Sequence, residues 1–150
     1  YQKGDIKFYS IEEISQYVNK LVESAWAIRR WGKFRRRIQV TENKKRESVC
    51  WARKIDLSIT LSSWGWNKIV VLHELSHLLS CYGAPHGRHF ARTFLELIGH
   101  ELGYDAQKAL KKEYKYRRVK YLPQRELSEE IREKLRQNFK KNVLKQTCTC

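Results

Sequence analysis

The sequence contains no methionine, only two prolines, and no apolar run longer than four residues. A membrane-spanning helix needs roughly 18 consecutive apolar residues, so the sequence predicts none. No positively charged segment followed by an apolar one stands at the N-terminus, and we therefore expect no secretory signal. The start at Tyr1, together with the lack of methionine, indicates a fragment whose flanks are missing.

Cysteine is scarce and unevenly spaced, with four residues at Cys50, Cys81, Cys148 and Cys150. Secreted domains that depend on disulfides usually show denser and more even spacing. We therefore expect reduced thiols and an intracellular protein, located in the cytoplasm, the nucleoid or the nucleus. The terminal pair could supply half of a metal site, but an ordinary polar tail is the simpler interpretation.

Acidic residues are few in two long segments. The net charge is +15, and segment 29–54 carries 11 Lys and Arg against 2 Glu. Segment 106–150 carries 14 Lys and Arg against 5 Glu. Segment 55–104, which lies between these two, is nearly neutral, with 3 Lys and Arg against 4 Asp and Glu. Two basic blocks suit a polyanion, because Lys and Arg that contact phosphates release counterions. We therefore expect nucleic acid, DNA in particular, as a partner; a basic surface that serves only solubility is the alternative.

The composition is that of a globular protein, since 41% of the 150 residues are hydrophobic and 12% are aromatic. The length suits one domain with its own core rather than two. We predict one globular domain over residues 1–122 and a basic helical extension over residues 123–150.

Hydrophobic periodicity predicts an α+β fold, in which an N-terminal helix precedes a small sheet of three or four strands and further helices follow. Ser10 and Glu13 have the spacing of a capping box at the start of the first helix. The charged segment 42–46 between two short strands suggests a β-hairpin. The expected helices lie at about 11–31, 68–82, 88–102, 106–117 and 127–143, and the expected strands at about 35–40, 48–52 and 55–61.

The most informative motif is HELSH at residues 73–77, on the helix expected to begin after Asn67. Residues four apart lie on one face of a helix, so His73 and His77 can offer imidazole nitrogens to one ion. Glu74 projects about 100° away from that line and can reach a water on the ion without binding the ion. Imidazole suits zinc (Zn²⁺), which lowers the pKa of its bound water to about 7. Chance supplies only about 0.01 such motifs in a chain of this composition; two core histidines satisfied by backbone groups are the alternative.

A catalytic zinc ion needs a third protein ligand and an open fourth position. The candidates after the motif are His86, His89 and, more remotely, Glu96 and His100. We favour His86 over His89, because the Gly-Ala-Pro break at 83–85 lets the chain fold back beside the helix. His100 begins a second His-Glu pair, but Tyr104 stands where its second histidine would have to be. We therefore interpret His100 as an exposed residue at a helix end.

Segments 71–77 (VLHELSH) and 84–90 (APHGRHF) together resemble the SprT-like zinc metallopeptidases. They are also similar to small metallohydrolases of actinobacteria and their phages. Both groups place the HExxH helix after a strand, and a short loop then leads to a His-Gly-x-x-aromatic element that opens the next helix. The resemblance covers about residues 50–103 and implies a minimal zincin-like fold. It also implies a set of functional residues: His73, His77 and His86 as zinc ligands, and Glu74 as catalytic base.

For some members of that family, the resemblance further implies proteolysis of proteins attached to DNA. Several SprT-like proteins carry a C-terminal zinc ribbon built on paired CxxC motifs, whereas this sequence has Cys148 and Cys150 without that spacing. The spacing of the third histidine also differs from that of the metzincins, in which it follows the HExxH motif sooner.

We therefore expect a zinc-dependent metallopeptidase in which Glu74 deprotonates a zinc-activated water for attack on a peptide carbonyl. The strand at 55–61 would lie beside the site and pair with an extended substrate. Tyr82, His89 or Tyr104 can donate a hydrogen bond to the developing oxyanion. Two alternatives stay open: a zinc hydrolase of a non-peptide amide or ester, and a nucleic-acid-binding module with a non-catalytic zinc site. The five tryptophans are core residues or platforms for unpaired bases.

Overall fold

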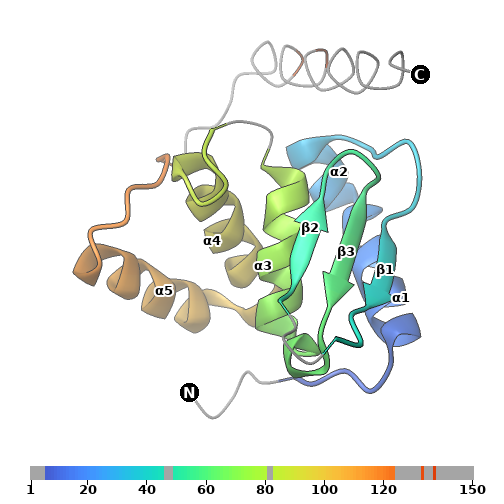
Figure 1. Ribbon diagram of the computed structural model, residues 1–150. Helices are drawn as coiled ribbons and strands as arrows, with labels where there is room; N and C mark the ends of the chain where they lie inside the picture. Colours follow the sequence, from blue (N-terminus) through green and yellow to red (C-terminus); the bar gives the residue numbers. More distant parts are fainter. Residues whose placement is uncertain (1–5, 46–48, 81–82, 124–132, 134–136, 138–150) are drawn as a thin grey trace.

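The computed structural model describes residues 6–45, 49–80, 83–123, 133 and 137. Within them, five α-helices and a three-stranded mixed sheet form an α+β fold, which confirms the predicted class (Figure 1). The elements are α1 (Ile11–Val22), α2 (Ala25–Trp31), β1 (Gln39–Glu42), β2 (Trp51–Arg53), β3 (Ser58–Leu61), the 3-10 turn η1 (Ser63–Gly65), α3 (Lys68–Leu79), α4 (Arg88–Leu102) and α5 (Tyr104–Tyr116). The helix expected at 127–143 and the two terminal cysteines lie outside the described residues, apart from positions 133 and 137.

The single helix predicted over 11–31 is wrong, because Ser24 divides it into α1 and α2. Ser24 has extended backbone, and its hydroxyl accepts a hydrogen bond from the N–H of Ala27 at 3.2 Å, so it caps a second helix. Ser10 caps α1 as predicted and accepts from the N–H of Glu13 at 3.1 Å. The carboxylate of Glu13 reaches back to the backbone N–H that precedes Ser10, which differs from an ideal capping box by one residue.

The strands are ordered β1-β3-β2, with β3 parallel to β1 and antiparallel to β2. The hairpin predicted across segment 42–46 is therefore wrong, since β3 lies between its two expected strands. The hairpin actually joins β2 to β3 through residues 54–57, where Leu57 has a φ of 52°. Ile55, predicted to start a strand, lies 67% exposed in this turn.

The core lies between the sheet, α1 and the helices α3 and α4. Ile59 and Leu61 of β3 are fully buried, and so are Leu72 and Leu75 of α3. Figure 1 shows α3 between the sheet and α4, so packing on both sides fixes its position. None of the described helices has both the length and the apolar character that crossing a bilayer requires.

Two local signals position α3 and α4 as predicted. Asn67 caps α3, its side-chain oxygen accepting from the N–H of Val70 at 2.9 Å. Gly103, with a φ of 91°, separates α4 from α5, and this left-handed conformation is one that glycine adopts readily. The helix α5 starts at Tyr104, directly after that glycine, rather than at Ala106.

Candidate metal centre

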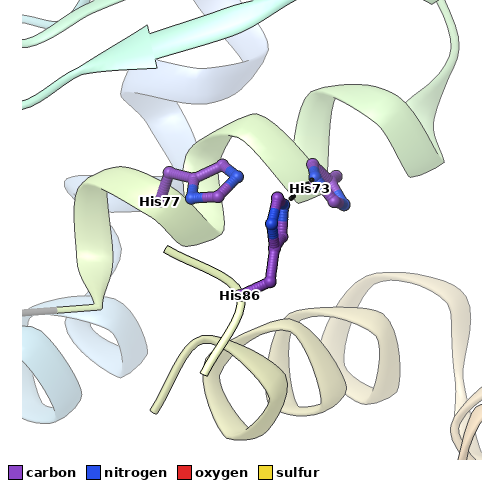
Figure 2. A group of neighbouring side chains, drawn as sticks. All are labelled: His73, His77 and His86. Carbon is purple, nitrogen blue, oxygen red and sulfur yellow. Dashed lines mark hydrogen bonds between the residues drawn. The ribbon is translucent and has the colours of Figure 1, made fainter. Parts of the chain in front are cut away.

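The three histidines proposed as ligands come together beside α3 (Figure 2). His73 and His77 lie one turn apart on α3, and His86 returns from the loop that precedes α4 with its imidazole directed at them. One nitrogen from each imidazole lies within 4.8 Å of the other two. The Nε2 atoms of His73 and His86 are 3.2 Å apart.

This spacing is compatible with one tetrahedral metal ion. Two imidazole nitrogens bound to zinc at about 2.0–2.1 Å in tetrahedral geometry lie about 3.3 Å from each other. The 3.2 Å between the Nε2 atoms of His73 and His86 is close to that separation. A set of three histidines also leaves one of four positions for water or substrate. The residues present therefore fit zinc, and the donor set is one that this ion commonly takes.

The environment of His73 and His77 favours the neutral imidazole, which is the form that binds a metal. Burial, followed by the neighbouring His73, His86 and Lys54 in that order, lowers the pKa of His77 to about 4. The pKa of His73 is also lowered, chiefly by burial and then by His86. His77 hydrogen-bonds to the backbone of Pro85, which has only a carbonyl to offer, so a ring N–H donates. The other ring nitrogen of His77 then keeps its lone pair for a metal.

Phe90 supports all three imidazoles from the first turn of α4. Its ring centroid lies 4.9 Å from that of His73, 4.5 Å from His77 and 4.9 Å from His86. Phe90 is itself buried. In the sequence it is the aromatic residue of the His-Gly-x-x-aromatic element with no role assigned to it, whereas the structure puts its ring against all three imidazoles. Its position four residues after His86, at the start of a helix, is the signal that could have revealed this contact.

Glu74 lines the same cavity as the three histidines without joining their cluster. The cavity has a volume of about 550 Å³ and is open to solvent. Glu74 is only 6% exposed, and this burial raises the pKa of its carboxyl to about 7. The acid that the sequence proposed as general base therefore stands beside the candidate ligands, within the cavity where a substrate would enter.

The other candidate ligands lie away from this cluster. His89 is exposed on the first turn of α4 and is not one of the grouped histidines. Glu96 forms an ion pair with Arg30 of α2 and another with an arginine of its own helix. His100 is exposed near the end of α4, as predicted, and it stacks on Trp26 of α2 with 3.7 Å between ring centroids.

The candidate oxyanion donors gain no support from the structure. Tyr82 lies outside the described residues, while Tyr104 is 71% exposed at the start of α5. Neither Tyr104 nor His89 is among the described residues that line the cavity. Lys54, which no sequence motif singles out, donates a hydrogen bond to the carbonyl of Ser80 at the end of α3. It is close enough to His77 to lower the pKa of that histidine.

The strand beside the cavity is β2, and the prediction that segment 55–61 fills this place is wrong. β3 pairs with β1 on one edge and with β2 on the other, so it cannot take another strand. Within the described sheet, β2 is an edge strand, and it packs against α3. Trp51 and Ala52 of β2 both line the cavity. Any pairing of an extended chain next to the histidines therefore involves β2.

A comparison of the chain with protein-family models, with curated proteins and with solved structures finds no match in any of the three. The resemblance to SprT-like metallopeptidases stays a prediction. The function is therefore inferred from the geometry of this site.

Proposed function

We propose that the protein is a zinc-dependent metallopeptidase in which His73, His77 and His86 hold the ion and Glu74 is the general base. The observation that carries this proposal is the cluster of three imidazole nitrogens within 4.8 Å, beside a buried carboxyl group, on the wall of an open cavity. Structural zinc sites are closed by four protein ligands, whereas catalytic sites keep three and an open position. Among the described residues, no fourth histidine, cysteine or carboxylate joins the cluster.

The chemistry follows from where the side chains lie. When bound, a zinc ion polarises a substrate carbonyl and makes a water molecule more acidic. Glu74 takes the proton of that water as the water attacks the carbonyl, and then delivers it to the departing amine. Glu74 is one residue after His73, so the helix turns it about 100° away from the ligand line, and it is not one of the grouped ligands. Phe90 holds the three imidazoles in place, and His77 is further oriented by the Pro85 carbonyl.

A peptide substrate is favoured over other amides or esters because of the edge strand. The free edge of β2 can form main-chain hydrogen bonds with an extended chain that lies across the cavity. A small amide or ester has no backbone to pair in this way. A zinc hydrolase of a non-peptide amide or ester is therefore the alternative enzyme.

The proposal is tested with zinc-loaded protein and two substrates, casein and histone, each with and without single-stranded DNA. We expect cleavage that stops on chelation and resumes when zinc is restored. Glu74→Gln should lower the rate by about 100-fold or more while retaining zinc. Glu113→Gln, an exposed glutamate on α5, is the matched control and should cleave like the wild type. No cleavage by wild-type protein with a full complement of zinc, or equal cleavage by Glu74→Gln, would contradict the proposal.

A second candidate function, binding of DNA, is favoured by a basic groove on α5. This groove has a volume of about 780 Å³. Its cationic lining consists of Lys108, Lys111, Lys112 and Lys115. Because lysines that contact phosphate release counterions, DNA affinity should fall steeply with salt. A Lys111→Glu, Lys112→Glu double variant should bind duplex DNA more weakly than wild type at every salt concentration; unchanged binding would contradict a role for this groove.

A further inference from the structure

Several large, exposed apolar side chains line the cavity. Val49 is 66% exposed, Trp51 41%, Trp64 59% and Ile69 41%, and all four line the cavity that holds the histidines. They come from the segment leading into β2, from β2 itself, from η1 and from the first turn of α3. Single exposed apolar residues are ordinary on a protein surface, but several around one cavity mark a binding site.

These side chains lie at a defined distance from the histidines. One face of α3 carries Ile69, His73 and His77, which are spaced four positions apart. Four residues of helix advance about 6 Å along its axis. An extended peptide advances about 3.3 Å per residue. A substrate side chain that rests on Ile69 therefore belongs to a residue about two positions from the bond held at the histidines.

The charge of the cavity indicates which kind of ligand fits there. None of its described lining residues is Lys or Arg, and Glu74 is the only carboxylic acid among them. A nucleic acid whose bases stacked on the tryptophans would bring several phosphates to a wall that offers them no Lys or Arg, and the one ion proposed at the histidines could neutralise only the phosphate next to it. An uncharged apolar side chain meets no such penalty. The tryptophans next to the candidate metal centre therefore suit a peptide better than unpaired bases.

We propose that Trp51, Trp64 and Ile69 form an apolar subsite that binds one bulky hydrophobic side chain of the substrate, within about two residues of the cleaved bond. The inference rests on the proposed peptidase function, because the histidines define where that bond lies. Trp51 connects the subsite to the free edge of β2, where the substrate backbone is held extended.

The subsite also restricts the substrate class. Bulky hydrophobic side chains are mostly buried in folded proteins. To bind here, a segment must expose such a side chain to the cavity and leave its backbone free to pair with β2. Only an unfolded or locally opened stretch of protein does both. The substrate is therefore a protein segment that has lost its native packing.

The test begins with the cleavage profile of the zinc-loaded wild type on a library of peptides from a denatured proteome, mapped by mass spectrometry. One position within about two residues of the cleaved bond should be enriched in Leu, Ile, Phe and Trp. Two peptides that differ only by Phe or Ala at that position are then compared. Trp64→Ala and Ile69→Gln should each lower kcat/KM for the Phe peptide by about tenfold, since each removes one wall of the subsite. For the Ala peptide, kcat/KM should change by less than about twofold in either variant.

The matched control is Tyr116→Ala, which removes an aromatic side chain that is 83% exposed on α5 and lies outside the cavity. Its kcat/KM should equal that of the wild type for both peptides. Zinc content and circular dichroism establish that each variant is folded and loaded. If Trp64→Ala fails to fold, the cleavage profile of the wild type and the kcat/KM values of Ile69→Gln still test the subsite.

Cleavage without any apolar preference, or a preference that Ile69→Gln leaves intact, overturns the subsite while the proposed peptidase stands. Absence of cleavage by wild type with one zinc per chain overturns both. A third result also overturns the subsite: an oligothymidine that quenches tryptophan fluorescence in wild type but not in Trp64→Ala, with no apolar preference in cleavage, assigns the tryptophans to bases.

Discussion

The helices α3 and α5 differ in how they are held, and this difference separates two kinds of site. α3 is buried over most of its length and lies between the sheet and α4. Of the residues of α5, only Tyr114 is buried, and the remaining surface is rich in lysine. A metal site needs ligands fixed to within a fraction of an ångström, which packing on several sides provides. Contact with a polyanion needs only charge at the surface, and an exposed helix is sufficient for it.

The largest expected effect is the loss of a ligand from the packed site. His86→Ala should weaken zinc binding by well over about 100-fold, since removing even an outer-shell partner costs roughly 10- to 100-fold. His89→Ala, three residues away and outside the cluster, should change zinc affinity less than about twofold. Competition with a chromophoric chelator measures both. The reverse order would show that the wrong histidine has been assigned as third ligand.

Substitutions in the buried face of α3 should destabilise the protein far more than substitutions on the surface of α5. Leu75 is fully buried, and Leu75→Ala should lower the free energy of unfolding by about 3 kcal/mol because it leaves a cavity. Lys112→Ala on α5 should change it by less than about 0.5 kcal/mol. Urea denaturation of the metal-free protein gives both values. Equal effects would remove the distinction drawn between the two helices.

Phe90→Leu separates orientation of the histidines from burial. The replacement keeps an apolar side chain, so the free energy of unfolding should fall by less than about 1.5 kcal/mol. The imidazoles lose the ring that contacts all three of them, and zinc affinity should drop by about tenfold. Unchanged zinc affinity, measured by the same chelator competition, would show that Phe90 only fills space.

A polar contact also ties the start of α3 to the end of α4, and it should make stability depend on pH. Burial raises the pKa of Glu101, but hydrogen bonds from Tyr17 at 2.6 Å and from His100, together with Lys68 at 3.3 Å, outweigh it and leave the pKa below its usual value. A lowered pKa stabilises the fold above the unfolded value of about 4.3, and this contribution is lost as pH falls through the folded pKa.

Glu101→Gln should therefore lower the free energy of unfolding by about 1.5 kcal/mol at pH 7 and by much less at pH 3. Urea titrations at the two pH values check this, with Glu113→Gln on α5 as control. A constant difference between the wild type and Glu101→Gln would show that the carboxylate is not stabilised in the fold.

The parts of this protein that the sequence predicts well are local. The four-residue spacing of His73 and His77, the Asn67 cap and the chain break before His86 all act over a few residues, so the sequence alone is enough to name the candidate ligands. The order of the sheet is not predictable in this way, because β3 inserts between β1 and β2 through pairings over long sequence separations. A period-2 pattern shows that a strand exists and says nothing about its neighbours.

Two further features, the cap at Ser24 and the contacts of Phe90, are not predicted from the sequence, for physical reasons. Ser24 stands within an unbroken apolar periodicity, and its role as a cap depends on the direction the chain takes after α1. The contact of Phe90 with three imidazoles depends on how α4 packs on α3, which periodicity does not specify.

The central claim is an open zinc site made of three histidines, and X-ray absorption at the zinc edge tests it most directly. We predict three nitrogen ligands at about 2.0–2.1 Å and one oxygen from water, with one zinc per chain. His86→Ala should lose one of the nitrogens. A fourth protein ligand, seen for instance as sulfur at about 2.3 Å, would contradict the open position and with it the proposed peptidase.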